Sequence, residues 1–106
     1  MHADRLARLR RAIAAEGMDA VAVVPGPNLA YLTGLAFHLS ERPVVAFFPA
    51  AGEPVMVVPA LEATKARQSS FATSIETYDD PTGPAAAIRV ALDRLGLAGR
   101  RLGVEA

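Results

Sequence analysis

The feature that most constrains the fold is a series of short apolar runs, several of them rich in β-branched residues, separated by segments of helical periodicity. The apolar runs occupy residues 20–24, 44–48 and 55–58, and further short β runs are expected at residues 74–78 and 102–106. Such lengths suit strands, whereas a membrane-spanning helix needs about 20 apolar residues in succession. The pattern predicts an α/β fold with a mixed, mostly five-stranded sheet flanked by helices in three layers.

The longer helical segments are expected at residues 4–16, 60–68 and 84–95. Asp4 is the expected N-cap of the first. Gly17 is expected to end it in a left-handed cap followed by the hydrophobic Met18, and Gly96 with Leu97 repeats this arrangement after the last helix. The residues predicted on one face of that last helix are Ala85, Ile88, Leu92 and Leu95.

The connections predict the strand directions. Residues 49–54 are rich in Pro, Gly and Ala between two apolar runs, so the second and third strands should form an antiparallel hairpin. The later strand–helix–strand units should be right-handed crossovers between parallel strands. The sheet is therefore expected to be mixed.

The stretch from Pro25 to Pro43 is the most distinctive part of the chain. Pro27 suits the first position of a short helix, which Gly34 would end. Pro43 disfavours a helical conformation at Arg42, so this guanidinium should sit on extended backbone at the entrance of a strand. The loop before Pro43 carries Phe37, His38, Ser40, Glu41 and Arg42.

Three parts of this stretch, Asn28, Tyr31-Leu32-Thr33-Gly34 and Ser40-Glu41-Arg42-Pro43, lie between two β runs. Together they resemble the N-terminal domain of the creatinase, prolidase and aminopeptidase P family. The resemblance spans nearly the whole chain, so residues 1–106 are expected to form one such domain. It implies an α/β arrangement that is often described as ribonuclease-H-like.

The resemblance also implies where catalysis takes place. In this family a separate C-terminal domain of the pita-bread fold binds two divalent metal ions, often manganese or cobalt, through two aspartates, one histidine and two glutamates. A bridging hydroxide attacks the bond before proline. That domain is absent from these residues, and the last β run stops at the chain end, so we expect a non-catalytic module cut from a longer hydrolase.

For individual residues, the resemblance implies that Arg42, with Phe37 or His38, reaches into the active site of a partner subunit. From chemistry alone, Arg42 is either a fork for a substrate carboxylate or a surface ion-pair partner of Glu41 or Glu53. The positions that carry the family signature are Asn28, Tyr31 and Gly34.

The expected partners are the chain's own catalytic domain, a second identical subunit and a proline-containing peptide. Two alternatives stay open. The chain could be a stand-alone binding or oligomerisation module, or the same domain of a creatine-type amidinohydrolase.

Other candidate sites have simpler interpretations. His38 and Glu41 are three residues apart, but no third metal ligand accompanies them, so no metal site is predicted in this chain. Asp79 and Asp80 follow a strand and are interpreted as turn residues that bond their own backbone. Tyr31 is interpreted as a packing residue whose hydroxyl has a partner.

Charge excludes several classes of partner. The chain has 11 basic and 11 acidic residues, which provide no net field for nucleic acid or an anionic membrane. It has no cysteine and no secretory signal, so a cytoplasmic location is expected. A cluster of basic residues in the first helix is interpreted as a solvated face; it consists of Arg5, Arg8, Arg10 and Arg11.

Overall fold

The computed structural model describes residues 2–34, 43–67, 74–79, 81–97 and 100–104. The elements are, in chain order, α1 (His2–Ala15), β1 (Ala20–Val23), α2 (Pro27–Thr33), β2 (Val45–Pro49), β3 (Val55–Pro59), the 3-10 helix η1 (Ala60–Glu62), α3 (Ala63–Arg67), β4 (Ser74–Tyr78), α4 (Ala85–Arg94) and β5 (Leu102–Val104). In these ranges no helix is both long and apolar enough to cross a membrane.

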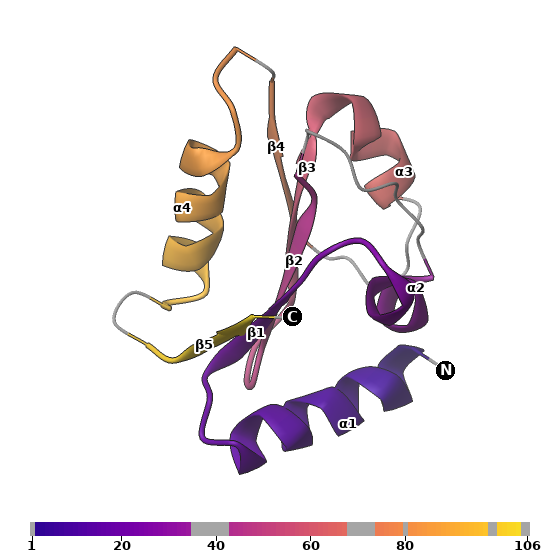
Figure 1. The fold of residues 1–106 in the computed structure, drawn as a ribbon, viewed down its shortest axis with the longest axis vertical. Coiled ribbons are helices and arrows are strands. Elements are labelled where there is room, and N and C mark those ends of the chain that lie inside the picture. Colours follow the sequence, from indigo (N-terminus) through magenta and orange to yellow (C-terminus); the bar gives the residue numbers. More distant parts are fainter. Residues whose placement is uncertain (1, 35–42, 68–73, 80, 98–99, 105–106) are drawn as a thin grey trace.

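The strands form one five-stranded sheet in the order β4-β3-β2-β1-β5. Strand β2 runs antiparallel to both of its neighbours, while β1 pairs in parallel with β5 and β3 pairs in parallel with β4. The predicted hairpin and the predicted mixed sheet are therefore confirmed. The last strand crosses to the far edge of the sheet, beside the first strand (Figure 1).

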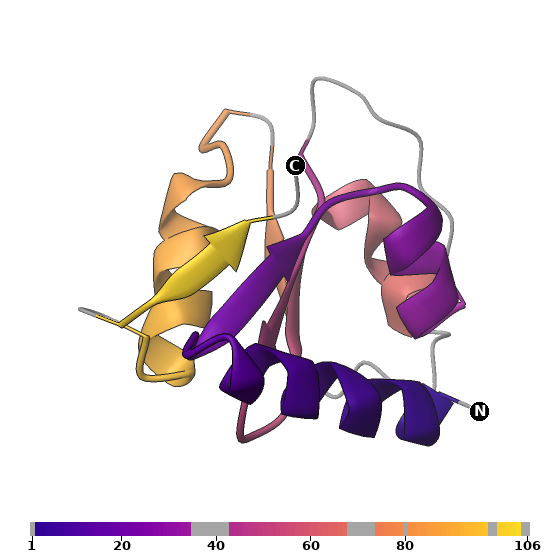
Figure 2. The same cartoon turned by 60° about the horizontal axis from the view of Figure 1, so that its bottom comes forward.

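Helices cover the two faces of the sheet unequally. Figure 1 shows α1, α2 and α3 on one side and α4 on the other, and Figure 2 shows the same arrangement from a second direction. Successive residues of β2 alternate between the two cores because neighbouring side chains of a strand point to opposite faces. Ala46 and Phe48 pack toward the three helices, whereas Val45 and Phe47 pack toward α4. The three-layer prediction is confirmed.

Two glycine caps end the long helices. Gly17 has a φ of 72°, and the Met18 amide donates to the Ile13 carbonyl at 3.1 Å. This bond, which spans five positions, satisfies a carbonyl that the helix end would leave unpaired. Gly96 and Leu97 end α4 in the same way, so both predicted caps are confirmed.

The predicted helix starts and faces are partly wrong. Helix α1 begins at His2, so Asp4 lies in its first turn instead of at the N-cap. A carboxylate in the first turn still interacts favourably with the helix dipole. Ala85 is exposed, because the side of α4 that faces the sheet is centred on Ala87 and Ala91. These small side chains let the helix lie close to the strands.

Asp19 joins three strands at the amino end of β1. Its backbone amide donates to the Arg101 carbonyl at 2.8 Å, and its carboxylate accepts the Arg101 amide at 2.9 Å. Its own carbonyl accepts the Ala50 amide at 2.8 Å. These three bonds set the entry of β5 beside β1 and the exit of β2.

Candidate functional site

Four strands end at the same edge of the sheet. Strands β1, β3, β4 and β5 are mutually parallel, so their carboxyl ends lie together, and the antiparallel β2 begins there. Open α/β sheets bind ligands at this edge because the loops that follow the strands gather there. We call it the carboxyl edge. Residues 35–42 join α2 to β2 in the sequence and lie outside the described ranges.

Both described flanks of this segment are held by hydrogen bonds. Gly34, with a φ of 75°, ends α2 and donates its amide to the Ala30 carbonyl at 2.8 Å. On the other side, the Pro43 carbonyl accepts the Tyr78 hydroxyl at 2.6 Å. The bond from Tyr78 ties the residue next to Arg42 to the end of β4. Gly34 thus acts as the helix terminator that the sequence predicts.

The side chains predicted to reach a partner's active site are not placed. Phe37, His38 and Arg42 lie outside the described residues, as does Glu41, so their roles stay predictions. Strand β2 begins two residues after Pro43, at Val45.

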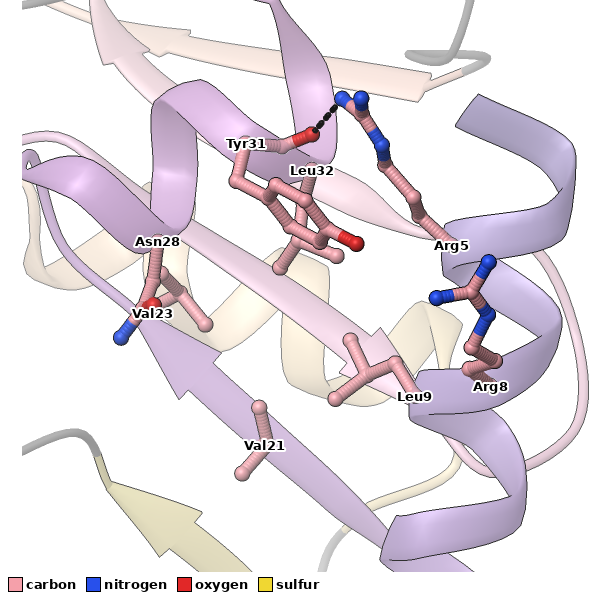
Figure 3. A pocket seen from close by; sticks show the side chains of 8 residues that line it. All are labelled: Arg5, Arg8, Leu9, Val21, Val23, Asn28, Tyr31 and Leu32. Carbon is pink, nitrogen blue, oxygen red and sulfur yellow. Dashed lines mark hydrogen bonds between the residues drawn. The ribbon is translucent and has the colours of Figure 1, made fainter. Parts of the chain in front are cut away.

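A cavity of about 420 Å³ lies between α1, β1 and α2 (Figure 3). We call it the α1–α2 cavity. Its volume falls in the range of small-molecule sites. Two of the three signature positions, Asn28 and Tyr31, line it. The full lining consists of Arg5, Arg8, Leu9, Val21, Val23, Asn28, Tyr31 and Leu32.

The orientation of α2 explains why Asn28 and Tyr31 face the cavity. Pro27 starts the helix, and Leu29 and Leu32 bury their side chains against the sheet. Asn28 and Tyr31 are three residues apart, so they share the neighbouring, more exposed side of the helix.

The packing role predicted for Tyr31 is wrong. Its side chain is 49% exposed. The Arg5 guanidinium lies 4.2 Å from the centroid of its ring, and Arg5 donates to the Tyr31 carbonyl at 2.7 Å. Its hydroxyl has no hydrogen-bond partner in the described part of the chain. No sequence pattern indicates this contact, because the two residues are 26 positions apart.

The arginines of α1 do not behave as one solvated face. Arg5 is engaged by Tyr31, and Arg10 donates to the Gly52 carbonyl in the β2–β3 turn at 2.5 Å. Arg8 and Arg11 are exposed, as predicted, and Arg8 borders the cavity. The prediction is therefore correct for only half of the cluster.

Asp79 is a turn residue, as predicted. Its carboxylate accepts the Thr82 amide at 3.1 Å, and its carbonyl accepts the Gly83 amide at 2.9 Å. Asp80 lies outside the described residues. Across the ranges that the structure describes, no three His, Cys, Asp or Glu side chains gather in a way that could hold a metal ion.

Comparison with known proteins gives a consistent result. The model of the family described as "Creatinase/Prolidase N-terminal domain" matches residues 5–106. The probable dipeptidase PepE of Mycobacterium tuberculosis is 38% identical over 72 residues, which are 68% of this chain and 19% of that protein. The chain thus spans about a fifth of this curated relative.

Solved structures share the fold. The dipeptidase PepE of Mycobacterium ulcerans superposes with a TM-score of 0.77 at 29% identity, covering 87% of this chain and 26% of the other. A proline dipeptidase from Streptococcus pneumoniae superposes with a TM-score of 0.81 at 29% identity, covering 94% and 72%.

Proposed function

This chain belongs to the creatinase/prolidase N-terminal domain family, and on that premise we propose that it is the non-catalytic N-terminal part of a longer Xaa-Pro dipeptidase-like metallopeptidase. The observation that carries the proposal is the family match over residues 5–106. The dipeptidase relatives are several times longer than the matched region, which leaves room in such proteins for a separate catalytic part.

Under this proposal, the metal-dependent hydrolysis takes place in the separate catalytic part of the longer protein. Two divalent ions, manganese or cobalt, would lower the pKa of a bound water and polarise the scissile carbonyl. The described residues of this chain do not fit such a site, since no three potential ligands converge. Under the proposal these residues supply a sheet whose hydrogen bonds hold Gly34 and Pro43, the two described neighbours of the segment 35–42.

The first prediction concerns activity. The purified 106-residue chain, incubated with Mn²⁺ and the dipeptide Gly-Pro, is expected to release no proline above the rate measured without protein. The physical reason is that no group in its described part can generate a metal-bound nucleophile. Trace metals are removed from the purified chain before Mn²⁺ is added, and proline release is then measured by chromatography.

Two outcomes would count against the proposal. Hydrolysis that disappears on chelation would show that the chain itself is a metallopeptidase. The reading frame beyond Ala106 provides the second test. If it encodes the set of two aspartates, one histidine and two glutamates, the peptidase assignment stands. A stop codon at that point would favour the stand-alone module.

We also propose that a second subunit packs on the half of the sheet that α4 leaves open. Helix α4 contacts β3 and β4. Leu102 and Val104 pair with Ala20 and Ala22 of β1, so they share the α4 side of the sheet. We call Val24, Leu102 and Val104 the apolar strip; their exposed fractions are 38%, 38% and 71%.

The apolar strip borders an open sheet edge, because no strand in the described part of the chain pairs with the outer side of β5. Such an edge offers unpaired backbone groups to another strand. Exposed apolar side chains and an unpaired edge together support an intersubunit contact at this position.

The second prediction tests this contact. Val104→Asp is expected to weaken self-association of the chain about 10-fold or more, because a buried carboxylate would replace an apolar contact. Sedimentation equilibrium measures the dissociation constant. Leu61→Asp is the matched control, since Leu61 in η1 is 79% exposed and lies outside the apolar strip. A monomeric wild-type chain, or equal effects of both variants, would contradict the contact.

A further inference from the structure

The α1–α2 cavity combines an apolar interior with a cationic rim. Val21 and Val23 of β1 form its floor, and Leu9 and Leu32 contribute from α1 and α2. Figure 3 shows these four aliphatic side chains pointing into the space between the two helices and the strand. An occupant would therefore have an apolar body.

Two guanidinium groups lie on one side of the cavity. Figure 3 shows Arg5 and Arg8, one helical turn apart on α1, with the phenol oxygen of Tyr31 pointing toward the α1 side of the cavity. The described lining contains no carboxylate, so their charge is not balanced within the cavity. This arrangement favours an anionic group at the rim.

The two arginines differ in how many of their N–H groups are still available for hydrogen bonds to a ligand. Arg5 is fixed by stacking on Tyr31 and by its bond to the Tyr31 carbonyl. Arg8 makes no hydrogen bond or ion pair in the described part of the chain, and all five of its N–H groups are available. A planar guanidinium binds a carboxylate through two parallel hydrogen bonds.

We propose that the α1–α2 cavity binds a small organic carboxylate whose apolar body lies on Val21 and Val23 and whose head group pairs with Arg8. The Tyr31 hydroxyl, which has no partner among the described residues, is a second donor at the rim. Arg8 is the guanidinium with hydrogen bonds left to donate, and its two parallel N–H groups match the two oxygens of a carboxylate better than the three oxygens of a phosphate ester. The proposal concerns this chain alone and does not depend on peptidase activity.

The test uses 4-phenylbutanoate as the probe and ¹⁵N-labelled chain as the receptor. Saturable shift changes are expected at the amides of Leu9, Val21 and Val23. The neutral 4-phenylbutanamide and the headgroup analogue acetate should each bind at least about 10-fold more weakly, because each lacks one of the two contacts. Phenylbutyl phosphate is the arm that distinguishes a phosphate site from a carboxylate site.

Two variants test whether Arg8 is the group that binds the carboxylate of the probe. Arg8→Gln is expected to weaken 4-phenylbutanoate binding about 10-fold, while Arg11→Gln, a matched change at an exposed arginine of α1 outside the lining, should alter it less than about 2-fold. Arg8 is itself exposed, so the variant should fold.

Several results would overturn the proposal. Absence of saturable binding, equal affinity for acid and amide, or an unchanged affinity in Arg8→Gln would each do so. Tighter binding of the phosphate ester than of the carboxylate would overturn the choice of head group. Shift changes confined to residues away from the cavity would overturn the location.

Discussion

Replacing Phe48 with alanine is expected to lower the free energy of unfolding by about 3–5 kcal/mol. Phe48 lies in β2, the central strand of the sheet, and its side chain is fully buried in the core under α1, α2 and α3. Truncation removes apolar contacts and leaves a cavity that close-packed neighbours fill only in part. Because domains of this kind are stable by about 5–15 kcal/mol in total, the loss is a large fraction.

Urea unfolding followed by far-ultraviolet circular dichroism measures this effect. The midpoint should fall while the slope with urea stays constant, since both proteins expose similar surface on unfolding. Leu61→Ala is the control, because Leu61 is 79% exposed and its truncation should change stability by less than about 0.5 kcal/mol. A loss below about 1 kcal/mol at Phe48 would mean that this residue is not central to the core.

The local features of the fold could be predicted from the sequence because they depend on neighbouring residues. The hairpin follows from two apolar runs joined by residues 49–54, and the left-handed caps at Gly17 and Gly96 follow from a glycine before a hydrophobic residue. Strand order could not be predicted in this way. That β5 pairs with β1 depends on bonds between Asp19 and Arg101, which are 82 residues apart.

The candidate site was predicted less well for the same reason. Asn28 and Tyr31 were singled out by the family resemblance, but their relation to a cavity requires α1 to pack beside α2. The stacking of Arg5 on Tyr31 arises only from that packing. No spacing in the sequence encodes such a contact, whereas the turn at Asp79 is closed by residues three and four positions away and could be predicted.

In a longer protein that includes a catalytic part, Arg42→Ala is expected to raise the KM for Gly-Pro about 10- to 100-fold with little change in kcat. The expectation follows from the first of the two interpretations of Arg42 given above, a fork for the substrate carboxylate, since a hydrogen bond to a charged group contributes roughly 1.5–3 kcal/mol. Pro43, the next residue in the sequence, is held by the Tyr78 hydroxyl, which donates to its carbonyl at 2.6 Å.

Steady-state kinetics with Gly-Pro and with Gly-Pro amide separate this role from a structural one. Removing Arg42 should abolish the preference for Gly-Pro over Gly-Pro amide, because only Gly-Pro has a carboxylate for Arg42 to bind. Arg42→Lys should restore part of the preference, since an ammonium keeps the charge but not the two-pronged geometry. Arg67→Ala, at an exposed arginine at the end of α3, is the control and should leave both substrates unaffected. Equal losses for acid and amide would show that Arg42 shapes the site without binding the carboxylate.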